Sequence, residues 1–245
     1  MPLFAMSYIL TQIQMAESGS KEFFEIMKLK STEDYKKKVE RKRLVNPTLK
    51  FENVTFNYEK SDTILEDVSF SIEKNESVAL VGHSGAGKST IINLILKFYL
   101  PTQGQLFMKD TNYNDVDATV VRNNIALVFQ ENELFSSTIK ENVAYGTPDA
   151  TEEEVVQALK LANAYEFVTK LPKGLDSEVG ERGVRLSGGQ KQRSTLARSL
   201  AIDPKILILD DSFSAVDTHT EEEILKKLKD FMNDRTSIII SHRIS

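Results

Sequence analysis

The sequence predicts an α/β fold, and two observations lead to this expectation. Short, bounded apolar runs, typical of buried parallel strands, recur at 77–81, 125–128, 206–209 and 237–240. The first run leads directly into a glycine-rich loop, which is followed by helical spacing of apolar residues from Ser89 to Phe98. Strand, loop and helix in this order are the context that a phosphate-binding loop requires.

Two further patterns complete the predicted domain over residues 48–245. Residues 49–56 and 68–72 carry β-branched and aromatic side chains with turn formers between them, so we expect a small antiparallel β portion. The stretch 130–186 is mostly helical in pattern, and Thr151 followed by three glutamates is a plausible capping start. The domain is therefore expected to contain a helical insertion.

The N-terminal segment, before this domain, is expected to be a helix. Residues 1–30 have apolar side chains near helical spacing, with a weak point at Ser18-Gly19-Ser20. Periodicity alone leaves open whether this helix packs on the domain or forms an arm. Residues 31–47 are highly charged and are expected to form a solvated linker. The alternative is a segment near an anionic membrane surface, where each basic side chain adds about 1 kcal/mol.

Composition excludes several classes of function. The net charge is −5, so the chain has no global basic field and no nucleic-acid partner is expected. The absence of cysteine excludes disulfides, thiolate metal sites and thiol catalysis. The three histidines are scattered, which argues against a structural metal site. The apolar start, Met1–Leu10, is too short for a membrane span and lacks the basic beginning of a signal peptide.

The glycine-rich loop at 82–89 matches the pattern G-x-x-x-x-G-K-S/T. Its glycines let backbone N–H groups converge on phosphates, and the following helix adds its positive end. Lys88 would reach the β and γ phosphates, and the Ser89 hydroxyl would bind Mg²⁺. The expected nucleotide ligands are Gly82, His83, Ser84, Gly85, Ala86, Gly87, Lys88, Ser89 and Thr90.

Asp210 ends the apolar run at 206–209. A carboxylate at the carboxyl end of a buried strand is well placed to hold Mg²⁺ through water beside the phosphates. An aspartate in this position can also be an ordinary helix cap or turn residue. Together with the phosphate loop, Asp210 indicates a metal site.

A second glycine-rich turn, Leu186-Ser187-Gly188-Gly189-Gln190, precedes a helix expected from about Lys191 to Leu200. Ser187 and the glycine amides at a helix start form an anion site in their own right. The phosphate loop and Asp210 need no second turn so far downstream. The turn therefore indicates a nucleotide held by another copy or by a partner.

These three motifs, in this order, resemble the ATP-binding cassette (ABC) ATPases, whose sites are shared between two facing domains. The resemblance covers roughly Leu49 to the end of the chain. It implies a P-loop NTPase fold with a small antiparallel β subdomain and a helical subdomain. It also implies ATP and Mg²⁺ as cofactors and a second cassette as partner, in a homodimer or a heterodimer.

The resemblance assigns further roles residue by residue. Gln130 is similar to the Q-loop glutamine, which ligates the metal and the attacking water, and His242 to the switch histidine at the γ-phosphate. Tyr58 resembles the A-loop aromatic, for which base stacking is worth about 1–3 kcal/mol; a half-buried strand tyrosine is the alternative. For Gln130 the alternative is an ordinary surface residue at a strand end. For His242 the alternative is a histidine near the chain end with no role at the nucleotide. Residues 214–217 resemble the D-loop, which couples the two sites.

Three segments resemble the exporter branch of the family. Residues 177–183 resemble the X-loop, residues 137–143 resemble the segment after the Q-loop, and the N-terminal arm is similar to the cytoplasmic end of the last membrane helix. The resemblance implies ATP hydrolysis that powers export, by a cassette at the cytoplasmic face of the cell membrane joined to a transmembrane domain of the same transporter. A soluble cassette acting in DNA repair or translation is the less favoured alternative.

The chain departs from the family pattern in two places. Asp211 stands where the family has a glutamate as general base, and the shorter side chain withdraws the carboxylate by about 1 Å, which can cost about 100-fold in rate. This substitution resembles the degenerate, slowly hydrolysing half of heterodimeric exporters. The chain also ends three residues after His242, where the family continues with a β-hairpin and a helix, so a truncated cassette is expected.

Overall fold

The computed structural model describes residues 2–29, 47–59, 62–129, 133–180 and 186–241. The chain divides into two compact units, Met1–Lys38 and Val39–Ser245. The predicted linker at 31–47 lies almost entirely outside the described residues and stays a prediction.

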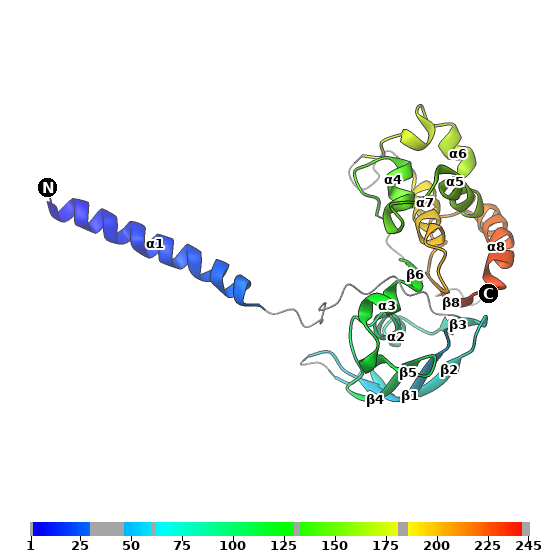
Figure 1. Cartoon of the computed structure of the whole chain (residues 1–245), viewed down its shortest axis with the longest axis horizontal. Helices are drawn as coiled ribbons and strands as arrows, with labels where there is room; N and C mark the ends of the chain where they lie inside the picture. The colour runs from blue at the N-terminus through cyan, green and yellow to red at the C-terminus, as the bar shows by residue number, and fades with distance from the viewer. Residues whose placement is uncertain (1, 30–46, 60–61, 130–132, 181–185, 242–245) are drawn as a thin grey trace. The chain divides into compact units, whose positions relative to one another are not determined.

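The described residues of the first unit form helix α1 (Pro2–Lys28), of 27 residues (Figure 1). The expected weak point does not interrupt it, because one glycine costs only about 1 kcal/mol relative to alanine, too little to break so long a helix. The Ser20 hydroxyl donates to the Glu17 carbonyl and stays within the helix. The large apolar side chains of α1 are exposed. Among the described residues, no helix has both the length and the apolar character needed to cross a bilayer.

The second unit begins with an antiparallel sheet in the order β2-β1-β4-β5. Its strands are β1 (Leu49–Phe56), β2 (Leu65–Ile72), β4 (Gln103–Met108) and β5 (Thr111–Asn112). Leu49 pairs with both Ile72 and Met108, so β1 lies between its two neighbours. The alternating apolar residues of β1 face the core, which confirms the predicted antiparallel portion. Strand β4 was not predicted.

A second, parallel sheet has the order β3-β8-β7-β6. Its strands are β3 (Ser77–Val81), β6 (Ile125–Val128), β7 (Ile206–Asp210) and β8 (Thr236–Ser241). They coincide, within one residue at each end, with the four predicted apolar runs. The α/β prediction with a parallel sheet is confirmed.

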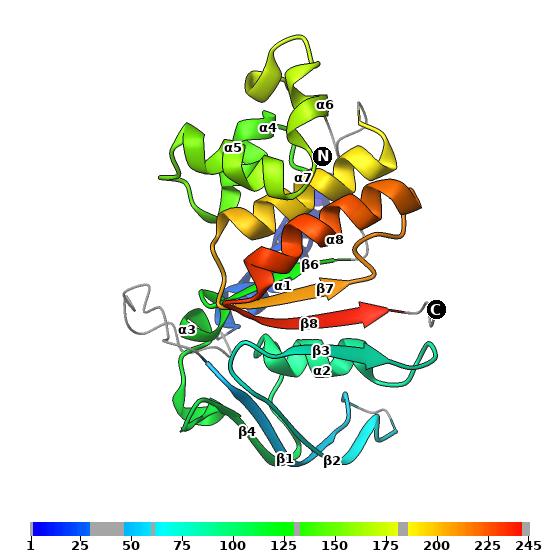
Figure 2. The same ribbon diagram turned by 90° about the vertical axis from the view of Figure 1, so that its right-hand side faces the viewer.

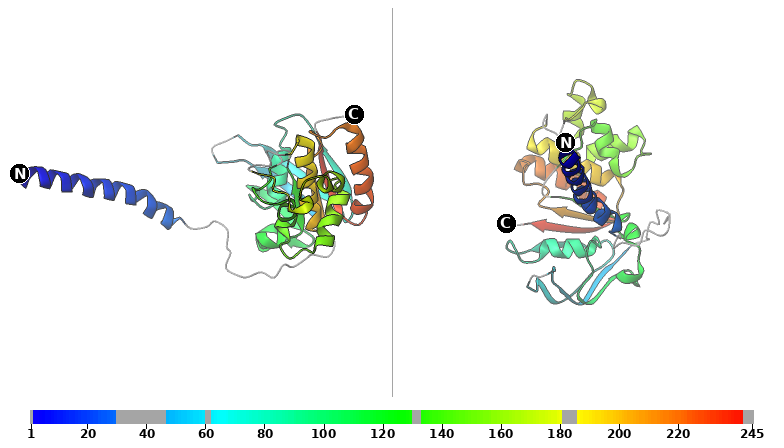
Figure 3. Two further views of the ribbon diagram at one scale, coloured as in Figure 1. Left: turned by 90° about the horizontal axis from the view of Figure 1, so that it is seen from above. Right: turned by 90° about the vertical axis from the view of Figure 1, so that its left-hand side faces the viewer.

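Helices cover both faces of the parallel sheet. Helix α2 (Lys88–Ile95) lies between the two sheets (Figure 2), where its apolar residues share one core with β1, β4, β7 and β8. Helices α7 (Gly188–Ala201) and α8 (Thr218–Met232) lie together on the opposite face (Figure 3). Their buried residues, including Leu196 and Ile224, pack with buried residues of the helical insertion in a second hydrophobic core.

The helical insertion is confirmed between β6 and α7. Thr151 caps α5, as the sequence predicted, and Glu154 completes the capping box. The remaining short elements are α3 (Ala118–Arg122), α4 (Ile139–Val143), α5 (Glu152–Leu161), α6 (Tyr165–Thr169), and the 3₁₀ turns η1 (Tyr113–Asp115), η2 (Ala144–Gly146) and η3 (Gly174–Asp176).

Candidate functional site

The topology brings the candidate residues to one edge of the parallel sheet. The phosphate loop follows β3, Asp210 is the last residue of β7, and β8 lies between these two strands. The register pairs Val81 with Ser241 and Asp210 with Ile240, so the carboxyl ends are level. Neighbouring strands lie about 4.8 Å apart, which places β3 and β7 about 10 Å from each other. The loop and Asp210 therefore border the same space.

The phosphate loop has a backbone that requires glycine at two positions. Gly85 has φ 83° and Gly87 has φ 86°, the left-handed region that other residues rarely adopt. A Cβ at Gly87 would lie 2.7 Å from the Leu65 Cδ2 atom, whereas one at Gly85 would meet nothing within 4 Å. Gly87 is the N-cap of α2 and supplies no side-chain cap, so the first backbone N–H groups of α2 have no side-chain oxygen from the cap position.

Lys88 is buried and its side chain folds back inside the loop. Its Nζ atom donates to the carbonyls of Gly82 at 2.7 Å and His83 at 2.9 Å. An ammonium group has three donors, so it can also serve a phosphate oxygen held by the same loop. Ser89 is exposed in the first turn of α2 and Thr90 is buried, and the role of Ser89 as a metal ligand stays a prediction.

The Ser84 carbonyl lies 2.9 Å from the His83 Nδ1 atom, while Ala86 donates its backbone N–H to the His83 carbonyl at 3.2 Å. These contacts close the loop on itself.

Tyr58 lies beside the start of α2. Its hydroxyl is 3.4 Å from the Thr90 Oγ1 atom and accepts a hydrogen bond from the Asn93 Nδ2 atom at 3.1 Å. The ring packs edge-on against Phe56 and Tyr99, with centroid distances of 4.9 and 5.0 Å. The residue is half-buried and adjoins the phosphate loop, and its role in base stacking stays a prediction. The sequence did not single out Asn93, because only the fold shows that it faces Tyr58.

Asp210 and Asp211 stand where β7 leaves the sheet. Asp211 has φ 43°, a conformation that aspartate tolerates better than most residues, and its backbone N–H donates to the Ile240 carbonyl at 3.1 Å. The candidate residues Gln130 and His242 lie outside the described residues, so their placement stays a prediction.

The donor set at this edge fits Mg²⁺. The Ser89 hydroxyl and the Asp210 carboxylate are hard oxygen ligands, and Mg²⁺ usually takes only one or two protein carboxylates beside water and phosphate. The part of the chain that the structure describes contains no group of three or more His, Cys, Asp or Glu side chains that could cage a metal. A metal here would therefore depend on the nucleotide for several of its ligands.

The second glycine-rich turn forms the N-terminus of α7. The Ser187 Oγ atom accepts a hydrogen bond from the Gln190 backbone N–H at 3.3 Å, and the Gln190 Oε1 atom accepts one from the Ser187 N–H at 3.0 Å. This capping box starts the helix at Gly188, three residues before the predicted Lys191, because the reciprocal cap outweighs the low helix propensity of Gly188 and Gly189. Ser187 and Gly188 are exposed.

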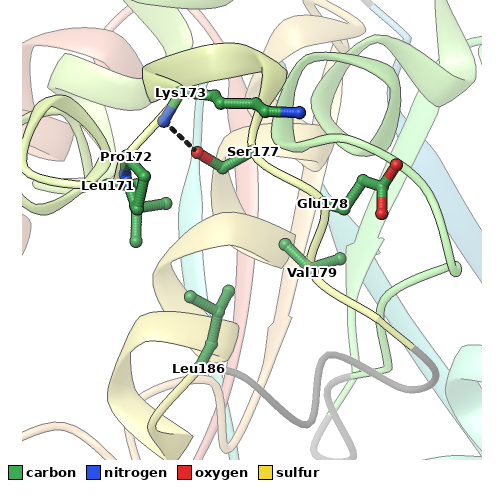
Figure 4. A pocket seen from close by; sticks show the side chains of 7 residues that line it. All are labelled: Leu171, Pro172, Lys173, Ser177, Glu178, Val179 and Leu186. Carbon is green, nitrogen blue, oxygen red and sulfur yellow. Dashed lines mark hydrogen bonds between the residues drawn. The ribbon is translucent and has the colours of Figure 1, made fainter.

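Two of the exporter-like segments lie side by side. The Ile139 backbone N–H donates to the Ser177 carbonyl at 3.1 Å, and the Val179 N–H donates to the Ser137 carbonyl at 3.1 Å. A cavity of about 350 Å³ adjoins them (Figure 4). It is lined by Leu171, Pro172, Lys173, Ser177, Glu178, Val179 and Leu186. Residues 181–183 of the predicted X-loop lie outside the described residues.

Asp217 caps α8 and ends the D-loop-like segment. The pKa of Asp217 lies below its usual range because its carboxylate accepts hydrogen bonds from the backbone and side chain of Thr220. Such a group stabilises the fold above its usual pKa, and this contribution is lost as the pH falls through the lowered value.

Comparison with known proteins identifies the family. The family model described as ABC transporter matches residues 65–214, which include the phosphate loop, the second glycine-rich turn and Asp210. This chain belongs to the ABC transporter family. The cassette therefore has the P-loop NTPase fold of ABC ATPases, as the resemblance implied, and is a nucleotide-binding domain.

The relatives of the cassette are larger proteins. It is 48% identical over 198 residues to YgaD of Bacillus subtilis, which bears the name multidrug export ATP-binding/permease protein, and the match covers 80% of the chain and 34% of that relative. A protein of the same description from Staphylococcus aureus is 51% identical over 195 residues, covering 79% and 34%. The chain thus spans about a third of the length of these curated relatives.

Among solved structures, a bacterial Atm1-family ABC exporter with ATP bound has a TM-score of 0.86 to this chain and is 38% identical. That match covers 94% of this chain and 40% of the exporter chain.

Proposed function

We propose that this cassette binds MgATP at the edge of its parallel sheet and hydrolyses it at an interface with a second cassette, to power export across a membrane. One observation carries the proposal: the exposed Ser187 turn begins a different helix from the phosphate loop, on the other face of the parallel sheet. Two anion-binding turns of this kind suit a nucleotide shared between facing copies. The names of the relatives, which join an ATP-binding part with a permease part, support a transport role.

The residues of the proposed nucleotide site divide into holding and reacting groups. Backbone N–H groups of 82–90 and the Lys88 ammonium bind the phosphates, and Tyr58 packs beside the base. Ser89, Gln130 and Asp210 hold Mg²⁺, which neutralises charge on the β and γ phosphates when bound. Asp211 accepts a proton from the attacking water, and His242 donates a hydrogen bond to the γ-phosphate.

The partner completes this site. The turn of Ser187, Gly188, Gly189 and Gln190 contacts the γ-phosphate of the nucleotide that the facing cassette holds. The proposal leaves the facing cassette to be either a second copy or a related chain.

The N-terminal segment is proposed to join the cassette to a transmembrane domain of the same transporter, at the cytoplasmic face of the membrane. The apolar side chains of α1, such as Phe4 at 85% exposed, support this because an apolar helix needs a partner or a lipid surface to cover it. Residues 31–47 would link it to the domain at 48–245.

Two measurements on the 245-residue chain test the proposal. Equilibrium binding should show that the chain binds ATP, and that magnesium raises its affinity for ATP. Sedimentation should show that the nucleotide promotes pairing, either with a second copy or with a copy that carries Asp211→Glu. The proposal would be contradicted if the chain did not bind ATP. It would also be contradicted if the nucleotide changed pairing neither with an unsubstituted copy nor with the Asp211→Glu copy.

A second candidate function is a degenerate, regulatory ATP-binding half of a heterodimeric exporter. Asp211 favours it, because its carboxylate is one methylene shorter than that of the glutamate general base. Replacing Asp211→Glu should raise turnover about 100-fold if the short acid limits hydrolysis, and Asp211→Asn should not raise it. Unchanged turnover in Asp211→Glu would rule out the degenerate interpretation.

A further inference from the structure

Gln192 is a buried polar residue that the proposed chemistry does not use. It lies on α7, two residues after the Ser187–Gln190 turn, and is only 1% exposed. Burial of a side-chain amide costs free energy unless its donors and acceptor are satisfied. The partners of Gln192 therefore indicate what the fold uses it for.

All the hydrogen bonds of the Gln192 side chain go to the segment that follows β7. Its Oε1 atom accepts a hydrogen bond from the Ala215 backbone N–H at 3.0 Å. Its Nε2 group donates to the Ser214 hydroxyl at 3.3 Å and, more weakly, to the Asp211 carbonyl at 3.5 Å. One amide thus fixes three points of the segment 211–215.

The same segment also packs against the glycines of the turn. A Cβ atom at Gly189 would lie 3.1 Å from the Ala215 carbonyl oxygen, and one at Gly188 would lie 3.4 Å from the Ala215 Cβ atom. Ala215 is therefore held between the Gln192 amide and the first turn of α7. Any displacement of residues 211–215 must move the Ser187 turn or break this contact.

At its other end the segment begins at Asp211. The Asp211 carbonyl accepts hydrogen bonds from the Ser214 N–H as well as from Gln192, and its own N–H is held by Ile240 of β8. Gln192 consequently joins the proposed general base to the turn that serves the other cassette.

We propose that Gln192 is a positioning residue that couples the two shared nucleotide sites, by fixing the Ser187 turn relative to Asp211. This inference rests on the proposed function, in which Asp211 acts on the nucleotide of its own chain and Ser187 on that of its partner. Gln192 itself touches neither nucleotide.

The test replaces Gln192→Met in the full 245-residue chain, which keeps the length of the side chain and removes its hydrogen bonds. Ser199→Ala is the matched control, because the Ser199 hydroxyl is also buried on α7 but donates to the Leu127 carbonyl of β6. We expect Gln192→Met to bind AMP-PNP with the wild-type affinity as a monomer. Its AMP-PNP-dependent pairing with an Asp211→Glu copy should weaken about tenfold, the effect of one lost buried hydrogen bond. Ser199→Ala should pair as the wild type does.

Amide hydrogen exchange adds a readout that is independent of pairing: exchange at Ala215 should quicken in Gln192→Met. Ser214→Ala, at an exposed position, should show a smaller loss of pairing even if Gln192→Met does not fold.

Unchanged pairing in Ser214→Ala or Gln192→Met, or an equal loss in Ser199→Ala, would overturn the inference. If the unsubstituted chain fails to pair, the proposed function fails first and the inference falls with it. If the chain pairs but the variants behave like the control, only the inference fails.

Discussion

The cassette contains two glycine-rich helix N-termini that are built in opposite ways. Helix α2 begins at a buried Gly87 in the left-handed region, with no side-chain cap and with Lys88 folded into the loop. Helix α7 begins at an exposed Ser187 whose capping box with Gln190 satisfies two backbone N–H groups within the chain. The first turn presents uncapped donors from inside the domain, whereas the second is capped by its own side chains and exposes Ser187 and Gly188. The contrast suggests that the N-terminus of α2 holds the phosphates of the nucleotide. The N-terminus of α7 then contacts a nucleotide that the facing cassette already holds.

The largest expected effect comes from removing the charge at the first terminus. Lys88→Ala should weaken ATP binding about 100-fold, because a buried charge-assisted hydrogen bond contributes up to about 3 kcal/mol. Isothermal titration with MgATP measures the change. Lys74→Ala, at an exposed turn before β3, is the control and should bind ATP normally. Equal affinities in the two variants would mean that Lys88 does not serve the nucleotide.

The next effect separates steric from conformational demands in the phosphate loop. Gly87→Ala should destabilise the fold by about 3 kcal/mol, because the left-handed backbone and the contact with the Leu65 Cδ2 atom both oppose a Cβ. Gly85→Ala meets no neighbour and should cost only about 1 kcal/mol from its backbone. Denaturant unfolding of both variants gives the two free energies. A smaller cost for Gly87→Ala than for Gly85→Ala would show that the loop relaxes away from Leu65.

The smallest effect sharpens the comparison at the second terminus. Ser187→Ala and Thr151→Ala each remove the cap of a helix that begins with a capping box, so each should lower the free energy of unfolding by about 1 kcal/mol. Only Ser187→Ala should also weaken nucleotide-dependent pairing, measured by sedimentation. If both variants pair equally well, the Ser187 hydroxyl has only a structural role.

The sequence predicted the elements whose signal is local. The four parallel strands are continuous apolar runs with clear ends. The spacing of Thr151 and Glu154 indicates the capping box that begins α5. Strand β4 was not predicted because Gln103–Met108 is apolar only in its second half. Its pairing with β1 also depends on residues about fifty positions away in the sequence. The start of α7 was placed too late because two glycines argue against a helix, although the Ser187–Gln190 spacing signalled the cap.

The candidate site was predictable as a set of motifs but not as a set of contacts. The spacing of Gly82–Ser89 and the position of Asp210 are visible in the chain, whereas the link from Gln192 to Ala215 joins residues that only the fold brings together. The family match confirms the nucleotide-binding domain. The roles of individual residues still depend on the experiments above.

The most direct test asks whether the Ser187 turn of one copy meets the phosphate loop of another. The chain has no cysteine, so Ser187→Cys can be placed in one copy and Ser84→Cys, with Asp211→Glu, in a second. The proposed arrangement predicts that, with an added thiol oxidant, a disulfide between the two copies forms readily in the presence of magnesium and AMP-PNP and poorly without them. Cross-linking at the same rate with and without nucleotide, or no cross-link at all between copies that bind AMP-PNP, would contradict it.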